Sequence, residues 1–178
     1  LNNLKYLDMS NNELKGTIPI TIGNLTMLET IKLSYNDLEN EISSELINLP
    51  QLKTLLLFGN NLSGEIPSFN NGLVMEELKL YQNNLSGVIP ESIENLSQLK
   101  NLQLNFNNLS GVIPIGLLKL PNLNVLKLSY NQLTFSSESV PTDICNIERV
   151  YLDYNNLSGS VPDCVCNMAY ISLSNNNL

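Results

Sequence analysis

The chain has 178 residues, a formal net charge of −8 and no histidine. With 9 basic against 17 acidic residues, it has no basic footprint for a nucleic acid or an anionic membrane surface. The lack of histidine excludes Ser-His-Asp and Cys-His catalysis and removes the commonest metal ligand. No apolar run approaches the roughly 18 residues that cross a bilayer, so we expect no membrane insertion by this segment.

A pattern of the form LxxLxLxxNxL recurs along the whole chain. It starts at Leu4, Leu28, Leu52, Met75, Leu99, Leu123, Ile147 and Met168. Its ninth position is always asparagine: Asn12, Asn36, Asn60, Asn83, Asn107, Asn131, Asn155 and Asn176. A fixed period of this length predicts a solenoid, here one domain over residues 1–178, in which each coil buries its apolar residues against its neighbours. The coils are numbered 1 to 8 from these starts, and the positions of each repeat are counted from its first residue.

Each repeat predicts one short strand, because apolar residues at positions 4 and 6 follow strand periodicity with one face buried. Stacking of the coils then makes one parallel sheet. The asparagine turns the chain inward after the strand, and its amide can satisfy backbone groups of its own and the neighbouring coil. We therefore interpret the eight asparagines as a structural ladder.

Most repeats continue with a glycine and a proline, as in Leu109-Ser110-Gly111-Val112-Ile113-Pro114. Glycine permits a turn with positive φ, and proline fixes φ and cannot donate to a ladder. We expect a short strand of a second, weaker sheet here. The rest of the coil, such as residues 91–96, fits a helical or 3-10 turn on the convex side.

A 24-residue unit of the form LxxLxLxxNxLSGxIPxxIGxL resembles the plant-type leucine-rich repeat, which occurs in receptor-kinase ectodomains, receptor-like proteins and polygalacturonase-inhibiting proteins. The resemblance covers essentially the whole chain. It implies an α/β solenoid, a right-handed superhelix with a parallel concave sheet, short second-sheet strands and 3-10 or irregular convex segments. The same scaffold serves many ligands, so the resemblance specifies the fold more closely than the function.

Three coils depart from this pattern. Coil 2 reads Leu38-Glu39-Asn40-Glu41-Ile42-Ser43, without the glycine or the proline. Coil 3 is one residue short and has the sequence SFNNGL at residues 68–73, and coil 6 carries an insertion at residues 135–139. In coils 6 and 7 the segment after the proline is shorter than in coil 5, so the convex side should narrow toward the C-terminal end.

The three cysteines lie in this narrower region. Cys145 and Cys166 both stand two residues before a repeat start, and equivalent positions in adjacent coils lie ~5 Å apart, inside the ~4.4–6.8 Å Cα window of a disulfide. The register therefore favours a Cys145–Cys166 disulfide, with Cys145–Cys164 as the weaker option. The alternative is a small buried residue repeated in register. Three cysteines without histidine do not favour a metal site.

Nine of the eleven aromatic residues occupy strand positions that should face solvent. They are Tyr6, Tyr35, Phe58, Tyr81, Phe106, Tyr130, Tyr151, Tyr154 and Tyr170. Tyr35, Phe106, Tyr130 and Tyr154 share position 8, directly before the ladder asparagine. Exposed aromatics are favoured interface anchors, so we predict a binding surface on the concave face. The alternative is lateral packing of residues with high β-propensity.

Charge is distributed unevenly. The exposed strand positions hold 7 basic and 6 acidic residues, whereas the rest of the chain holds 2 basic and 11 acidic residues. Lys32, Lys79 and Lys127 share position 5, and Arg149 lies on the same face. These cations are candidate contacts for a carboxylate-bearing partner, and ordinary solvation of a sheet face is the alternative.

Six N-x-S/T sequons are candidate glycosylation sites, at Asn24, Asn61, Asn84, Asn95, Asn108 and Asn156. Four of them come from the recurring Asn-Leu-Ser phrase of the repeat. They fit an extracellular or secretory location, and glycans there would shield one lateral edge and leave the other free.

These features favour a non-catalytic module that recognises a protein or peptide on its concave face, of the receptor-ectodomain or secreted-inhibitor type. A structural or scaffolding subunit that contacts partners through its edges or ends is the alternative, and polysaccharide binding is a further one. We expect no enzyme activity, cofactor, metal or nucleic-acid partner. The repeat also predicts that further repeats or a partner cover both ends, because open ends expose core leucines.

Overall fold

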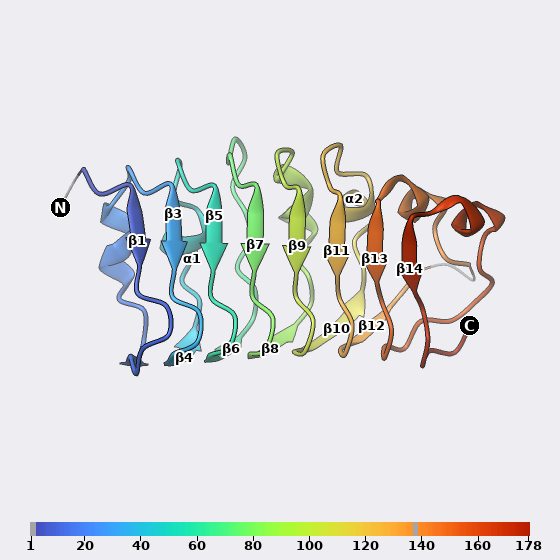
Figure 1. Cartoon of the computed structure of the whole chain (residues 1–178), viewed down its shortest axis with the longest axis horizontal. Coiled ribbons are helices and arrows are strands. Elements are labelled where there is room, and N and C mark those ends of the chain that lie inside the picture. Colours follow the sequence, from blue (N-terminus) through green and yellow to red (C-terminus); the bar gives the residue numbers. More distant parts are fainter. Residues whose placement is uncertain (1–2, 137–138) are drawn as a thin grey trace.

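The computed structural model describes residues 3–136 and 139–178 and shows an elongated stack of eight coils with the two termini at opposite ends (Figure 1). Two residues at the start of the predicted domain, 1–2, and two of the coil 6 insertion, 137–138, lie outside the described residues. Each coil contributes one strand to a long parallel sheet, as the repeat predicts. The fold is therefore the expected leucine-rich-repeat solenoid.

The long sheet has eight parallel strands, each formed by positions 3 to 5 of one repeat. They are β1 (Tyr6–Asp8), β3 (Thr30–Lys32), β5 (Thr54–Leu56), β7 (Glu77–Lys79), β9 (Asn101–Gln103), β11 (Val125–Lys127), β13 (Arg149–Tyr151) and β14 (Tyr170–Ser172). The register is in phase, so Leu55 pairs with Leu78 and Leu78 with Leu102, and all three are fully buried. The solvent side of this sheet is called the sheet face below.

A second parallel sheet has six strands in the order β12-β10-β8-β6-β4-β2. They are β2 (Lys15–Gly16), β4 (Asp37–Glu41), β6 (Asn61–Gly64), β8 (Asn84–Gly87), β10 (Asn108–Val112) and β12 (Gln132–Thr134). Figure 1 places these strands along one border of the long sheet, below the carboxyl ends of its strands. The side of the molecule that these strands form is called the flank.

Short helices close most coils on the side opposite the sheet face. They are η1 (Ile20–Asn24), α1 (Ser44–Ile47), η2 (Glu91–Asn95), α2 (Ile115–Leu118), η3 (Thr142–Asn146) and η4 (Asp163–Asn167), the four η elements being 3-10 helices. Buried Leu46, Ile93 and Leu117 of these helices complete one continuous apolar core with the strand residues. Within the described parts of the chain, no helix is long and apolar enough to cross a membrane.

The departures in coils 2 and 3 have simple physical compensations. Asn40 stands where other coils have glycine and adopts the same left-handed backbone, with φ at 68°. Ser43 replaces the proline and caps α1, because its hydroxyl accepts a hydrogen bond from Leu46 N at 3.3 Å. Coil 3 forms no helix between β6 and β7, and Phe69, which is only 3% exposed, fills the core there instead.

The predicted Cys145–Cys166 pairing is wrong. The disulfide joins Cys145 of η3 to Cys164 of η4, with the Cα atoms 6.1 Å apart, and Cys166 is an exposed free thiol. The two half-cystines are offset by two residues, and in a 3-10 helix of 3 residues per turn that offset rotates a side chain by about 240°. Side chains at equivalent places in two stacked turns project in parallel, whereas this offset lets two sulfur atoms meet.

Candidate functional site

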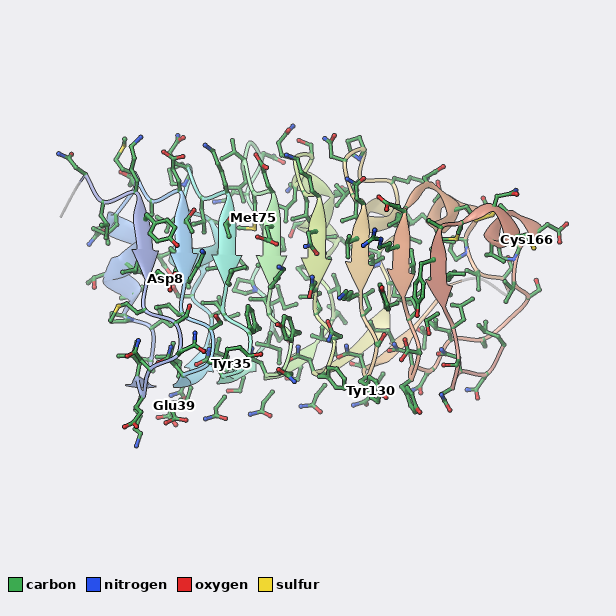
Figure 2. All side chains as sticks on the ribbon, in the orientation of Figure 1. Asp8, Tyr35, Glu39, Met75, Tyr130 and Cys166 are labelled. Carbon is green, nitrogen blue, oxygen red and sulfur yellow. A yellow bond between two sulfur atoms is a disulfide. The ribbon has the colours of Figure 1, made fainter. Side chains whose placement is uncertain are left out.

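Six aromatic side chains from coils 2 to 7 form one row on the sheet face, here called the aromatic ridge: Tyr35, Phe58, Tyr81, Phe106, Tyr130 and Tyr154. In Figure 2 the labelled Tyr35 and Tyr130 lie beside the carboxyl ends of the strands, along the same border of the long sheet. The exposed fractions of these two residues are 50% and 41%. Residues far apart in the sequence are therefore brought into one row on this face.

The first half of the ridge is a triad in coils 2 to 4. Tyr35 meets Phe58 edge-on with ring centroids 5.1 Å apart, and Phe58 stacks on Tyr81 at 4.4 Å. Gly59 makes this possible, because a Cβ there would lie 2.6 Å from Cδ1 of Tyr35. Partial burial, and then the nearby Tyr35 hydroxyl, raise the pKa of the Tyr81 phenol.

The second half is a triad in coils 5 to 7. Phe106 stacks on Tyr130 at 4.4 Å and Tyr130 stacks on Tyr154 at 4.2 Å, with interplanar angles of 17° and 13°. Desolvation by the neighbouring rings raises the pKa of the Tyr130 phenol, and a hydrogen bond with the Tyr154 hydroxyl acts in the same direction. The Tyr130 phenol therefore stays a neutral hydrogen-bonding group at neutral pH.

The backbone at position 8 is left-handed in every coil. Tyr35, Phe106, Tyr130 and Tyr154 have φ between 53° and 57°, and Asn11, Gly59, Gln82 and Asn175 take the same conformation at the equivalent place. Neighbouring coils hold it: Tyr130 N donates to Asp153 O at 3.0 Å, and Tyr130 O accepts from Asn107 N at 3.3 Å. This conformation, which the repeat pattern did not predict, aims the ring away from the core.

The asparagine ladder fixes the chain directly after each ridge residue. Asn107 Nδ2 donates to Leu80 O of the preceding coil at 3.0 Å and to Leu104 O of its own coil at 3.1 Å. Its Oδ1 accepts from Leu85 N at 3.0 Å. The same three contacts recur at Asn36, Asn60, Asn83, Asn131, Asn155 and Asn176. At Asn12 the amide donates only to carbonyls of its own coil, Met9 O and Ser10 O.

Two amide residues separate the triads. Gln82 holds position 8 of coil 4, where coil 5 has Phe106, and Asn105 holds position 7 of coil 5, where coil 4 has Tyr81. Asn105 Oδ1 is buried without a hydrogen-bond partner in the described part of the chain. The ridge is therefore two aromatic triads with a polar break between them.

Position 2 carries a ladder of alternating charge at the opposite border of the sheet face. Glu29 bridges Lys5 at 3.0 Å and Lys53 at 2.8 Å, and Glu76 pairs with Lys100 at 2.6 Å. The Lys53 and Lys5 ammonium groups lower the pKa of the Glu29 carboxyl, and Lys100 lowers that of Glu76. These lysines neutralise carboxylates of adjacent coils.

The other predicted cations are also engaged within the sheet face. Lys32 Nζ donates to the Tyr6 hydroxyl at 2.8 Å, which raises the pKa of Lys32, and it lies 3.8 Å from the Asp8 carboxylate. Lys79 pairs with Glu77 at 2.7 Å, and Arg149 pairs with Glu148 at 3.3 Å. Lys127 forms no ion pair among the described residues and lies 5.0 Å from the centroid of the Tyr151 ring.

The remaining predicted aromatics lie on the sheet face outside the ridge. Tyr151 and Tyr170 stack at 4.6 Å in the last two coils, and Tyr6 stands in coil 1 beneath the Lys32 ammonium. The two aromatics that the pattern left off the strands, Phe69 and Phe135, are buried. The structure therefore places all nine predicted side chains on one face and brings six of them into one row.

Five of the six sequon asparagines are exposed, namely Asn24, Asn61, Asn84, Asn108 and Asn156. All but Asn24 and Asn95 share position 10: Asn61, Asn84 and Asn108 are the first residues of β6, β8 and β10, and Asn156 has the same position in coil 7. Asn95 differs: it is half-buried at the end of η2, and its Nδ2 donates to Phe69 O at 2.9 Å.

Comparison with known proteins agrees with this architecture. Residues 1–177 match the family model of a leucine-rich repeat region, and no curated protein matches the chain. Among solved structures, the plant peptide hormone receptor RGFR1 in complex with RGF2 is 36% identical, with a TM-score of 0.90 over 97% of this chain and 28% of that one.

Two further receptor structures are similar. PEPR1 with AtPEP1 is 31% identical, with a TM-score of 0.90 over 97% of this chain and 25% of that one. The Arabidopsis receptor kinase HAESA with the peptide hormone IDA and the co-receptor SERK1 is 30% identical, with a TM-score of 0.73 over 98% of this chain and 34% of that one. The chain thus spans about a quarter to a third of the length of these receptors.

Proposed function

Because the chain belongs to the leucine-rich repeat family, we propose that it is part of an extracellular receptor-type ectodomain that binds a peptide or protein on its sheet face. The observation that carries this proposal is the aromatic ridge. Its position 8 rings stay between 41% and 50% exposed although their left-handed backbone is unfavourable for aromatic residues. Exposed tyrosines held in fixed positions are effective interface anchors because little side-chain entropy is lost on binding.

The geometry of the ridge suggests the form of the ligand. The central rings Phe58 and Tyr130 have a neighbouring ring on each side, so the ridge presents mainly ring edges, which carry partial positive charge, and phenolic hydroxyl groups. Both attract hydrogen-bond acceptors such as the carbonyl groups of an extended peptide. From Tyr35 to Tyr154 the ridge crosses five coil spacings, or roughly 24 Å, which is the length of about seven extended residues.

Polysaccharide binding is less well supported by the same geometry. Sugars pack their apolar faces against free aromatic ring faces, and the central rings of the triads, Phe58 and Tyr130, have a neighbouring ring on each side. The engaged lysines likewise give little support to a strongly anionic polymer as the ligand, since most of them already pair with carboxylates on the sheet face.

An extracellular location is supported by the similar receptors, by the disulfide and by the exposed sequons. We expect mass spectrometry of the protein from its native source to find glycans on exposed Asn61, Asn84 and Asn108. Asn95 should be unmodified, because its amide is half-buried and hydrogen-bonded to Phe69 O. A protein without any glycan would contradict the proposed location.

The binding proposal is tested by selecting peptides of about 12 residues, which span ~40 Å when extended, from a random display library on the wild-type chain. The selected peptides are then titrated against the double variant Tyr130→Asn/Tyr154→Asn. Asparagine occupies the same left-handed position at Asn11 and Asn175, so the variant should fold. We expect at least about a tenfold loss of affinity, which is ~1.4 kcal/mol.

Ile20→Asn is the matched control, because Ile20 is 60% exposed on η1, away from the sheet face. It should leave the affinity of the selected peptides unchanged. Equal binding to the wild type and the ridge variant, or an equal loss in the control, would contradict a binding site on the ridge.

A further inference from the structure

A second surface, separate from the sheet face, is hollowed into the flank of coils 2 to 4. The groove has a volume of about 580 Å³, and its floor is formed by buried Ile42 and Ile66 with the backbone of Gly64. Exposed Glu41, Glu65 and Val88 line its rim. It is called the lateral groove here. It lies beside residues 68–73 of coil 3, the segment in which the neighbouring coils have a helix and this coil has none.

The rim carries negative charge without compensation. The six ion pairs among the described residues all lie on the sheet face, and none of them includes Glu41 or Glu65. Both side chains lie flat on the neighbouring coil: a Cβ on Gly64 would lie 2.6 Å from Cγ of Glu41, and one on Gly87 would lie 2.8 Å from Cγ of Glu65. The two glutamates therefore occupy equivalent places in adjacent coils along the flank.

The same row continues as an apolar surface. Position 14 is occupied by Glu41, Glu65, Val88 and Val112 in coils 2 to 5. The Val88 side chain lies against the backbone of Gly111 in the next coil, as the side chains of Glu41 and Glu65 lie against Gly64 and Gly87. Val88 is 52% exposed, Val112 41% and Ile115 45%. An apolar patch beside uncompensated carboxylates matches a partner that carries apolar and basic side chains together.

We propose that the lateral groove docks a partner protein through an exposed segment in which a large aliphatic side chain is flanked by arginine or lysine. The aliphatic side chain packs on Ile66 and Val88, and the cations pair with Glu41 and Glu65. This contact uses a different surface from ligand binding on the aromatic ridge, because the ridge lies on the sheet face and the groove lies on the flank. One chain can then hold a ligand on the sheet face and a protein on the flank.

The test uses the capped peptide acetyl-Gly-Arg-Leu-Arg-Gly-amide and the full chain with labelled isoleucine and valine methyl groups. We expect saturable shifts at the methyl groups of Ile42, Ile66 and Val88 in NMR spectra, weaker at high salt. Two control peptides should bind at least about tenfold more weakly. In one, serine replaces the leucine and removes the aliphatic contact; in the other, glutamate replaces both arginines and removes the cations.

Glu41→Lys/Glu65→Lys should weaken binding of the arginine peptide by about tenfold or more. The control Glu13→Lys/Asp163→Lys changes the net charge equally at exposed positions outside the groove and should leave the affinity within about twofold. The proposal is overturned by absent shifts, by shifts confined to the sheet face, or by equal losses in both double variants. Tyr130→Asn, which tests the ridge, should not affect this titration.

Discussion

At the residue scale, position 8 of the repeat carries the most informative side chains. A left-handed backbone costs roughly 1–2 kcal/mol for a residue with a Cβ, and asparagine and glycine avoid much of this cost. Coils 1, 3 and 8 do use Asn11, Gly59 and Asn175 there, whereas four coils use an aromatic residue. Stacking stabilises each ring pair by about 0.5–1.5 kcal/mol, which offsets much of the backbone strain. It does not explain why the aromatic rings at position 8 are left exposed to solvent.

Tyr130 separates these effects. Tyr130→Asn should leave the free energy of unfolding within about 1 kcal/mol of wild type, because relief of backbone strain offsets the lost stacking. Tyr130→Val should destabilise the chain by about 2 kcal/mol or more, because a β-branched residue is strained at φ of 57° and also loses the stacking. Urea unfolding measures both, and equal stability of the two variants would contradict the role of the backbone.

The ladder asparagines are a second residue-scale feature. Asn107→Ala removes the side-chain acceptor of buried Leu85 N and one of the two amide donors to Leu80 O and Leu104 O, which keep Asn83 Nδ2 and Asn131 Nδ2. The expected loss is on the order of 3 kcal/mol, from about 1–3 kcal/mol for the unsatisfied Leu85 N–H and about 0.5–1.5 kcal/mol for each lost hydrogen bond to a carbonyl. Asn12→Ala is the matched control, because Asn12 is exposed and serves only its own coil, and it should cost about 1 kcal/mol. Thermal unfolding of both variants measures the two losses of stability, and similar losses would contradict the role assigned to the contacts between coils.

At the scale of elements, repeat spacing predicts the strands well because the core imposes one register on all coils. It predicts the short helices less well, since those segments vary in length and only one face of each is buried. The replacement of a helix by the side chain of Phe69 in coil 3 cannot be derived from a pattern that treats each coil alone. The Cys145–Cys166 prediction is wrong for a related reason: the spacing of parallel strands does not hold for side chains in the 3-10 helices η3 and η4.

The disulfide gives a prediction at this scale. Cys164→Ser should lower the free energy of unfolding by about 3 kcal/mol, as expected for closing a loop of this size. The disulfide closes this loop between Cys145 in η3 and Cys164 in η4, which are 19 residues apart in the sequence. Cys166→Ser should have little effect, and Cys166 should be the cysteine that an alkylating reagent modifies in the unreduced protein. Peptide mapping that finds Cys166 in the disulfide would contradict this assignment.

The position 2 ladder predicts a pH dependence. Hydrogen bonds from Lys53 and Lys5 keep the pKa of Glu29 below its usual range in the folded state. The interaction of ionised Glu29 with the two lysines therefore stabilises the folded state at pH values above the ordinary glutamate pKa of about 4.3. This contribution is lost as the pH falls through the lowered pKa that Glu29 has in the folded state. In Lys5→Met/Lys53→Met the Glu29 pKa should rise when carboxyl NMR signals are titrated. Glu76, which depends mainly on Lys100, should change little, and an unchanged Glu29 would exclude this cause.

At the scale of the whole molecule, stacking of the coils in register places side chains of different kinds on different surfaces. Seven of the nine basic residues and the ion pairs they form lie on the sheet face, whereas most of the acidic surplus lies elsewhere. The pattern of the repeat alone could place the nine aromatics on one face. It could not predict that six of them form two triads, because the arrangement depends on Gln82 and Asn105 between the triads and on the room that Gly59 provides.

The repeat pattern also did not predict that lysines on the sheet face form ion pairs with carboxylates of the same face. The lysines at position 5 suggest a site for an acidic partner, but Lys32 lies 3.8 Å from the Asp8 carboxylate of the preceding coil and Lys79 pairs with Glu77 of its own strand. Lys32 and Asp8 are 24 residues apart in the sequence and meet only because the coils stack. The same stacking leaves Glu41 and Glu65 without cations on the flank, where the lateral groove lies.

The central claim is that residues of coils 2 to 7 act as one continuous binding surface, and fluorine NMR tests it most directly. The chain contains seven tyrosines, and 3-fluorotyrosine gives each its own signal. On addition of a peptide selected on the wild-type chain, the signals of Tyr35, Tyr81, Tyr130 and Tyr154 should shift together with one affinity, while Tyr6 stays unchanged. Shifts confined to Tyr6, to one triad, or to none of these residues would contradict the account.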